Sequence, residues 1–196
     1  MTSAARTWGS TEEERAAAYP CDRYLAEPDD QLWRAIDVAA SPAVLFRWLC
    51  QLRAAPYSYD WIDNRGRRSP RELTPGLDAL AEGQRVMTIF RLTEFERDRH
   101  ITLVLERGQG MFGQLAMTYA VHPAPGGSRL VAKLVVKRPR GVGRVLSPLL
   151  PAGDLFMMKK QLRTLKAYAE RDAAVTDAAA SPASPSSTTT AARPPR

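Results

Sequence analysis

The sequence of 196 residues predicts one α+β domain in which a curved antiparallel sheet wraps around a long C-terminal helix. Two patterns predict this fold. Segments with alternating apolar and polar residues fill the middle of the chain, and a long stretch with apolar residues three and four positions apart follows them. Because each element has one apolar face to bury, the helix is expected to cover one face of the sheet. The hydrophobic content of 44% suits such a packed domain.

The elements follow in an order that favours this arrangement. Ser41 can cap a helix, and the proline after it stands at the first helical position, where its missing N–H costs nothing. In the last expected strand one face is apolar and the other carries lysines, so that second face is expected to be partly wet. A proline- and glycine-rich run joins the last two strands into a hairpin. The expected strands are 31–39, 84–95, 101–107, 114–121 and 128–137, and the expected helices are 43–52 and 154–171.

Composition divides the chain into three parts. Residues 1–28 form an N-terminal extension, residues 29–171 form the domain, and residues 172–196 form a tail rich in Ala, Pro, Ser and Thr. Because this tail has almost no large apolar side chains, burial cannot offset the entropy of ordering it. The tail is therefore expected to be disordered.

Charge and residue usage exclude several classes of protein. The net charge is +7, and no run approaches the ~18 consecutive apolar residues of a membrane-spanning helix. Glu12, Glu13 and Glu14 stand near the N-terminus with no apolar run behind a basic start, so a secretory signal is not expected. Two cysteines and two histidines without metal-ligand spacing predict neither a metal site nor a disulfide. We therefore expect a cytoplasmic protein with reduced thiols and no cofactor.

Three segments carry a resemblance to a known superfamily. The opening TWGSTEEE (7–14), the helical AVLFRWLCQL (43–52) and the aromatic YSYDWIDN (57–64) resemble stretches of actinobacterial members of the START-like, polyketide cyclase/dehydrase superfamily (SRPBCC). The aromatic segment is the most specific of the three. The resemblance spans about residues 7–171. It implies the helix-grip fold, with an apolar cavity enclosed between the sheet and the long helix.

The resemblance also implies a kind of function. Superfamily members bind lipids, sterols, plant hormones or aromatic polyketides, and some cyclise or dehydrate them. The chain is therefore expected to bind a hydrophobic small molecule, or alternatively to be a cofactor-independent cyclase or dehydratase. Its acid/base candidates are Tyr59, Asp60 and Tyr119, since phenol and carboxyl groups can move protons at an enolisable carbon. The expected ligand-binding residues are Trp48, Tyr57, Trp61, Met87, Phe90, Met117 and Met158.

These candidates have structural alternatives. The aromatic side chains of residues 57–64 can instead plug the end of the sheet, while Asp60 caps a helix or turn. The methionines and Phe90 can be ordinary core residues. Tyr119 is the most informative candidate, because a phenol on an apolar strand face must find a hydrogen-bond partner.

Basic residues gather in two groups, at 65–71 and at 137–144. Such groups can contact an anionic membrane surface or nucleic-acid phosphates. Nucleic acid is disfavoured, because the basic stretches lack interleaved stacking aromatics and no known reader motif is present. A transient membrane contact suits a protein that exchanges an apolar ligand. A role at a membrane or nucleic-acid surface is therefore a third alternative for the function. The sequence does not decide whether the protein is a monomer or a dimer.

Overall fold

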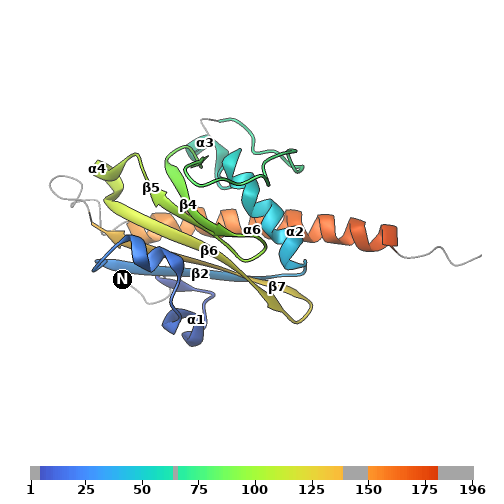
Figure 1. Ribbon diagram of the computed structural model, residues 1–196, viewed down its shortest axis with the longest axis horizontal. Helices are drawn as coiled ribbons and strands as arrows, with labels where there is room; N and C mark the ends of the chain where they lie inside the picture. Colours follow the sequence, from blue (N-terminus) through green and yellow to red (C-terminus); the bar gives the residue numbers. More distant parts are fainter. Residues whose placement is uncertain (1–4, 64–65, 139–149, 181–196) are drawn as a thin grey trace, which may run out of the picture.

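The sheet and the long helix confirm the predicted α+β fold. The computed structural model describes residues 5–63, 66–138 and 150–180. Within these residues seven strands form one curved sheet in the order β1-β2-β7-β6-β5-β4-β3, and the C-terminal helix α6 crosses it (Figure 1). The strands are β1 (Thr7–Trp8), β2 (Asp30–Val38), β3 (Arg85–Val86), β4 (Phe90–Glu96), β5 (His100–Leu105), β6 (Gln114–Ala124) and β7 (Gly127–Lys137). The helices are α1 (Glu12–Ala16), η2 (Pro20–Tyr24), α2 (Pro42–Cys50), η3 (Gln51–Arg53), α3 (Asp60–Asp63), α4 (Gln109–Phe112) and α6 (Leu150–Ala180).

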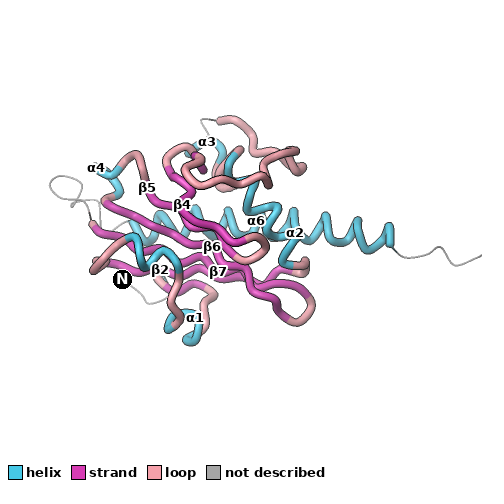
Figure 2. The backbone as a smooth tube through the Cα atoms, in the orientation of Figure 1, coloured by secondary structure: helices cyan, strands magenta, loops and turns pink. Residues whose placement is uncertain are grey.

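Helices α2 and α6 pack on the same face of the sheet, which we call the inner face (Figure 2). Leu45 and Leu49 of α2 are completely buried there together with Leu162 and Leu165 of α6. The sheet contributes the inward side chains of its antiparallel strands, with Leu103 of β5 among them. The core of the molecule therefore lies between the inner face and the two helices, as the layer argument predicts.

The start of α2 follows its sequence signals. The Ser41 hydroxyl accepts a hydrogen bond of 3.4 Å from the backbone N–H of Val44, and Pro42 is the first helical residue. The helix ends at Cys50 and continues as the tighter turn η3. The predicted helix over 43–52 is thereby confirmed, with its last turn in the 3₁₀ form.

The predicted single strand over 84–95 is wrong, because the chain reverses within it. Strands β3 and β4 pair with each other antiparallel, so that Val86 lies opposite Phe90. Met87 and Thr88 form the turn with backbone φ of +46° and +68°. Alternation of apolar residues continues through the turn, so the pattern alone does not reveal it. A contact from outside the hairpin holds the turn, since the Met87 N–H donates to the carbonyl of Leu52 at 3.0 Å.

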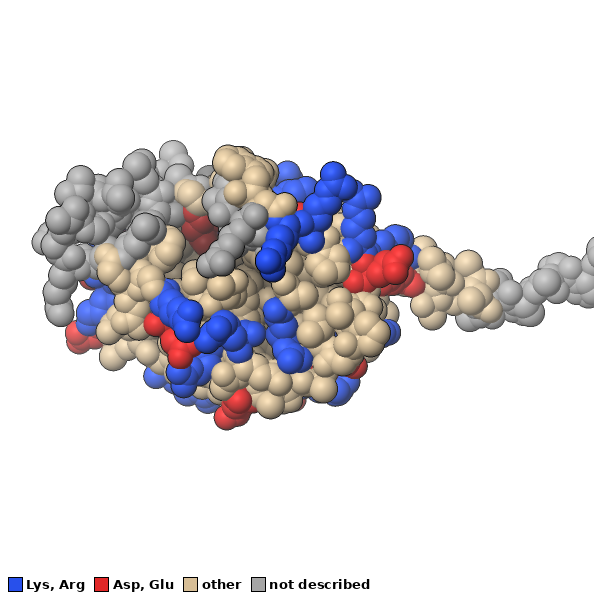
Figure 3. Space-filling view, turned by 90° about the horizontal axis from the view of Figure 1, so that it is seen from above, with Lys and Arg blue, Asp and Glu red and all other residues tan. Residues whose placement is uncertain are grey.

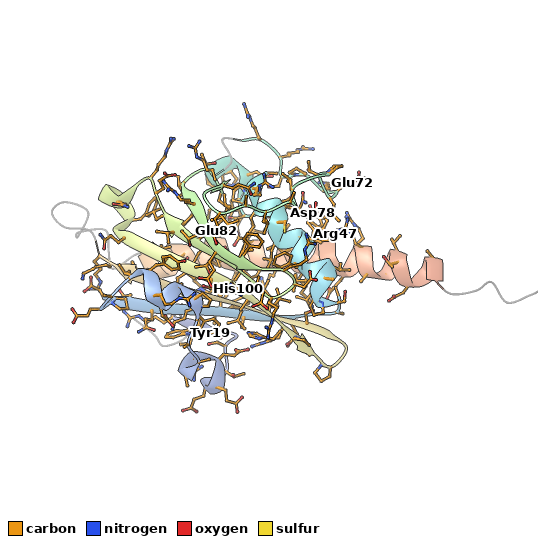
Figure 4. All side chains as sticks on the ribbon, in the orientation of Figure 1. Tyr19, Arg47, Glu72, Asp78, Glu82 and His100 are labelled. Atoms are coloured by element: carbon orange, nitrogen blue, oxygen red, sulfur yellow. The ribbon has the colours of Figure 1, made fainter. Side chains whose placement is uncertain are left out.

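The N-terminal part is more than an extension, because it joins the sheet and covers the face opposite α6, the outer face (Figure 1). Strand β1 pairs parallel with β2, and η2 lies against the middle strands. Figure 4 shows Tyr19 at this segment. Val131 and Val135 of β7, expected on a partly wet face, are buried here with Tyr19 and Cys21. The expectation of a wet outer face is therefore wrong in the region that this segment covers.

Lys133 fastens the N-terminal segment to the outer face. Its ammonium group is buried, forms an ion pair of 2.7 Å with Asp22, and lies over the rings of Tyr19 and Trp33 at 5.4 and 5.3 Å from their centroids. A buried ammonium group needs such partners, because desolvation penalises an isolated charge. The lysine that indicated a wet face therefore forms a buried anchor for the N-terminal segment.

Helix α6 is longer than predicted at both ends. It begins at Leu150 and continues to Ala180, so the prediction of disorder is wrong for residues 172–180, and residues 181–196 lie outside the described part. The alanine-rich composition favours helix, and Asp172 accepts a hydrogen bond of 2.9 Å from the indole N–H of Trp48. No helix within the described residues has the length and apolar character needed to cross a membrane.

Candidate functional site

Tyr119 and Gln161 form a hydrogen-bonded pair in the core. Tyr119 lies on β6 with its side chain in the inner core, completely buried, and its hydroxyl donates a hydrogen bond of 2.6 Å to Oε1 of Gln161 on α6. The Gln161 amide in turn donates to the carbonyl of Pro56 at 2.7 Å. Burial raises the pKa of the Tyr119 phenol far above its usual value, so the group is a neutral donor. The predicted partner of Tyr119 is thus found on α6.

Tyr57 is a second buried phenol, and it lacks such a partner. Its ring packs edge-on against the rings of Trp48 and Tyr168, with centroids 6.0 and 6.2 Å apart. The side chain is buried, and its hydroxyl has no hydrogen-bond partner within the described part of the chain. Burial raises the pKa of this phenol as well, so it keeps its proton. The Tyr57 hydroxyl is therefore an unused hydrogen-bond donor in the core.

Other donors near Tyr57 share a feature, since each of them contacts the thioether sulfur of a methionine. These contacts join Ser58 Oγ to Met157 Sδ (3.6 Å), Tyr119 Oη to Met158 Sδ (3.6 Å) and Gln161 Nε2 to Met87 Sδ (3.2 Å). A thioether is a weak acceptor. The Tyr119 hydroxyl also has Gln161 as an oxygen acceptor, whereas the Ser58 hydroxyl and the second N–H of Gln161 have a sulfur acceptor, so an oxygen atom would be a better partner for these two donors.

Two strained backbone segments meet at Gln161. Tyr57 has a backbone φ of +55°, and the turn residues Met87 and Thr88 also have positive φ. Non-glycine residues rarely adopt this conformation, and each instance costs roughly 1–3 kcal/mol. The Gln161 amide contacts both segments, through the carbonyl of Pro56 and the sulfur of Met87. Strain that surrounding contacts hold in place is typical of functional sites.

An ion pair between a buried arginine and a partly exposed aspartate lies on the same face of the sheet. Arg34 of β2 is completely buried, and its guanidinium donates to the Asp154 carboxylate of α6 at 2.7 Å. Ala132 is paired with Arg34 on one side and with Tyr119 on the other, so all three lie in one row across the sheet. Burial raises the pKa of Asp154 to about 6, and the nearby Arg34 charge offsets only part of this rise. A carboxyl with this pKa can hold or release a proton close to neutral pH.

Residues 59–61 lie apart from the buried phenols and from the Arg34–Asp154 ion pair. Tyr59 is half-buried and stacks on Phe156 of α6, with centroids 4.3 Å apart. The Asp60 carboxylate accepts hydrogen bonds from the backbone N–H and the hydroxyl of Ser69, at 2.9 and 2.5 Å, so it ties a loop as the structural alternative expects. Trp61 is 75% exposed and does not line the core as predicted. Of the three acid/base candidates, only Tyr119 lies in the interior.

The remaining predicted ligand-binding residues lie in or beside the inner core. Trp48, Phe90, Met117 and Met158 are buried there, and Met87 is partly buried. These positions suit both core packing and contact with an apolar molecule. A binding role for them stays a prediction.

Of three site residues that were not predicted, Arg34 and Gln161 have a signal in the sequence and Asp154 has none. Arg34 has the same strand parity as the apolar Leu32 and Ile36, and a charge at such a position requires a buried partner. Gln161 lies three residues after Met158 on the apolar stripe of α6. Asp154 stands at the predicted start of the long helix, where nothing in the sequence pairs it with Arg34.

The known proteins to which this chain is similar were found among solved structures. No protein-family model matches the chain, and no curated protein matches it significantly. The chain is similar to a protein from Thermobifida fusca (16% identity, TM-score 0.47, 72% of this chain and 93% of that one). It is also similar to a protein from Mesorhizobium loti (14% identity, TM-score 0.46, 72% and 97%). A further similar structure is the di-domain ARO/CYC StfQ from the steffimycin biosynthetic pathway (14% identity, TM-score 0.46, 74% and 51%), about half of whose length the chain spans.

At these identities, function has to be inferred from the residues of the chain itself. By its own architecture the protein is a helix-grip α+β protein, with a sheet that wraps a long C-terminal helix. Its inner core contains a buried arginine paired with Asp154, and hydrogen-bond donors that lack good acceptors among the described residues. No group of three or more His, Cys, Asp or Glu side chains in the described residues could hold a metal ion.

Proposed function

We propose that the protein binds an apolar small molecule with acceptor oxygens, such as a ketone or an ester, between the sheet and α6. The observation that carries this proposal is the buried Tyr57 hydroxyl, which has no partner among the described residues. An unpaired buried polar group costs about 1–3 kcal/mol. A ligand oxygen that accepts the Tyr57 hydrogen bond would remove this cost.

The methionines around these donors support the same proposal. Met87 and Met157 place sulfur atoms where a ligand oxygen would be the stronger acceptor for the Gln161 amide and the Ser58 hydroxyl. Unbranched methionine side chains change rotamer easily, so they can move aside for an irregular apolar molecule. Burial of the ligand at ~25 cal/mol per Å² would then supply most of the affinity, and the donors would fix its orientation.

The sequence resemblance also supports the proposal. The aromatic segment that resembles START-like proteins contains both Tyr57 and Ser58. Both residues carry a donor in the inner core that has no oxygen or nitrogen acceptor among the described residues. The most specific part of the resemblance therefore coincides with the donor-rich part of the core.

Native mass spectrometry of the purified protein, followed by solvent extraction, tests this proposal. We expect a bound compound of low molecular mass whose extract contains a carbonyl or ester group. An unliganded mass, together with no thermal stabilisation by a panel of ketones and esters, would contradict the proposal.

The second candidate function is cyclisation or dehydration of such a ligand, and the Asp154 carboxyl favours it. Its pKa of about 6 allows proton transfer near neutral pH, and its charge acts on the Tyr119 phenol. In this reaction Asp154 would take a proton from the carbon beside a carbonyl, and the Tyr57 hydroxyl, which has no partner among the described residues, would donate a hydrogen bond to the resulting oxyanion.

A linear diketone that cyclises with loss of water is a suitable probe for this second function. We expect Asp154→Asn to abolish catalysed cyclisation while diketone binding is retained, and the exposed Glu12→Gln variant to behave as the wild type. Equal cyclisation rates with and without the protein would exclude this activity for the probe.

A further inference from the structure

Exposed aromatic side chains gather where α3 meets the start of α6. Trp61 is 75% exposed and Phe156 is 54% exposed. Tyr59 connects the two elements, since its ring stacks on Phe156 with an angle of 3° between the planes. We call Tyr59, Trp61 and Phe156 the aromatic patch. Trp61 follows Tyr59 by two residues, so an exposed Trp and an exposed Phe belong to neighbouring segments, and large apolar side chains exposed close together mark an interaction surface.

Basic side chains lie beside the aromatic patch. Asp60 holds the following loop against α3, with its carbonyl accepting from the Gly66 N–H at 2.8 Å and its carboxylate bonded to Ser69. This loop carries the exposed Arg67 and Arg68. On α6 the exposed Lys160 follows Phe156 by one turn and shares its side of the helix.

We call Arg67, Arg68 and Lys160 the basic rim. Figure 3, seen from the side on which α3 lies in Figure 1, shows Lys and Arg side chains gathered on this face. The exposed Glu72 adds one opposite charge on the segment that follows. Acidic side chains also lie on this face, but the three residues of the basic rim bring positive charge next to the aromatic patch.

We propose that the aromatic patch and the basic rim dock the protein on an anionic lipid surface. Trp places its ring at the headgroup level of a bilayer, with the apolar body inward and the N–H toward water. Each Lys or Arg near an anionic surface adds electrostatic attraction to it. The combination matches the two layers of a membrane interface, an apolar interior below anionic headgroups.

The chain connects this surface to the inner core. Residues 57–61 run from the unpaired Tyr57 hydroxyl to Trp61, and the Ser58 hydroxyl contacts the sulfur of Met157 beside Phe156. A molecule that leaves a membrane at the aromatic patch would therefore meet the donors of the core next. The docking proposal itself rests on exposure and charge, and it stands whether or not the core binds a ligand.

Co-sedimentation of the full chain with vesicles tests the docking proposal. We expect binding to vesicles of equimolar phosphatidylcholine and phosphatidylserine, weakened by added salt, and little binding to pure phosphatidylcholine. Trp61→Ala and the double variant Arg67→Glu, Arg68→Glu should each weaken this binding, the double variant by about tenfold or more. Val175→Ala, which removes an exposed apolar side chain elsewhere on α6, is the control for Trp61.

The double variant Arg97→Glu, Arg107→Glu is the control for charge, since it makes the same change of net charge at other exposed arginines. Both controls should bind like the wild type. Absence of vesicle binding, or equal losses in the control and patch variants, would overturn the proposal. Binding to DNA or to a protein that needs the same residues, without vesicle binding, would overturn it as well.

Discussion

Tyr57 and Tyr119 are both buried phenols of the inner core, and they differ in what their hydroxyl groups contact. Tyr119 extends from a central strand whose register is fixed by β5 and β7, and its hydroxyl bonds to Gln161. Tyr57 follows Pro56 in a connecting segment with a positive φ, and its hydroxyl contacts no acceptor within the described residues. The two residues are otherwise alike, because both side chains are buried and burial raises the pKa of both phenols.

The comparison separates a structural from a functional phenol. The Tyr119 hydroxyl joins the sheet to α6, so its hydrogen bond contributes to the folded state. The unpaired Tyr57 hydroxyl and the strained backbone beneath it both cost free energy in the unliganded protein. Groups that are kept at such a cost are explained by an interaction with a molecule from outside the chain.

The largest expected effect concerns Asp154, whose carboxyl acts on Tyr119. Because its folded-state pKa is raised from the usual value to about 6, the folded protein binds the proton more tightly, and stability falls as the pH rises. A shift of about two units corresponds to about 3 kcal/mol, lost between about pH 4 and pH 6. Asp154→Asn should remove this dependence.

Denaturant unfolding of the wild type and of Asp154→Asn across this pH range measures the effect. The difference between the two profiles isolates Asp154 from the other carboxyls. A difference that is constant with pH would show that the Asp154 pKa is not raised.

A smaller loss is expected for Tyr119→Phe. The variant leaves Oε1 of Gln161 buried without its donor, so the free energy of unfolding should fall by about 1–3 kcal/mol. Urea unfolding with an unchanged m-value would measure this loss. If stability were unchanged, the bond between Tyr119 and Gln161 would not hold the sheet to α6.

The smallest effect on stability is expected for Tyr57→Phe. This variant removes a hydroxyl that has no partner, so the free energy of unfolding should stay within about 0.5 kcal/mol of the wild type or rise. The same unfolding experiment measures it beside Tyr119→Phe. A loss as large as that of Tyr119→Phe would mean that the Tyr57 hydroxyl is bonded in the unliganded protein, and the contrast between the two residues would disappear.

Much of the fold could be predicted from local patterns. Alternation over 128–137 and the apolar stripe after Asp154 locate the last strand and the long helix, because burial of one face imposes these periods. The turn at Met87 and Thr88 could not be predicted, since contacts with Leu52 and Gln161 hold it. Nor could the buried outer face, which depends on a segment that lies a hundred residues away in the chain.

The candidate site could be predicted only in part. The alternation of residues along the strand places Tyr119 on an apolar face, so its hydroxyl needs a hydrogen-bond partner. The alternation does not identify that partner as Gln161. The aromatic segment was expected to act as a unit, whereas the chain turns Tyr57 inward and Trp61 outward within four residues. A local pattern specifies which face a side chain takes, and the partner across the core is set only by how the elements pack.

The most direct test of the central claim is one titration with two probes of nearly equal shape, fluorenone and fluorene. They differ in a single acceptor oxygen, so their affinities report a hydrogen bond to the ligand. The wild type should bind fluorenone about 3- to 10-fold more tightly than fluorene, as expected for one hydrogen bond. In Tyr57→Phe this preference should vanish while fluorene binds as before. A preference for fluorenone that survives in Tyr57→Phe would contradict the assignment of Tyr57 as the ligand donor, and failure of both probes to bind would contradict the binding site.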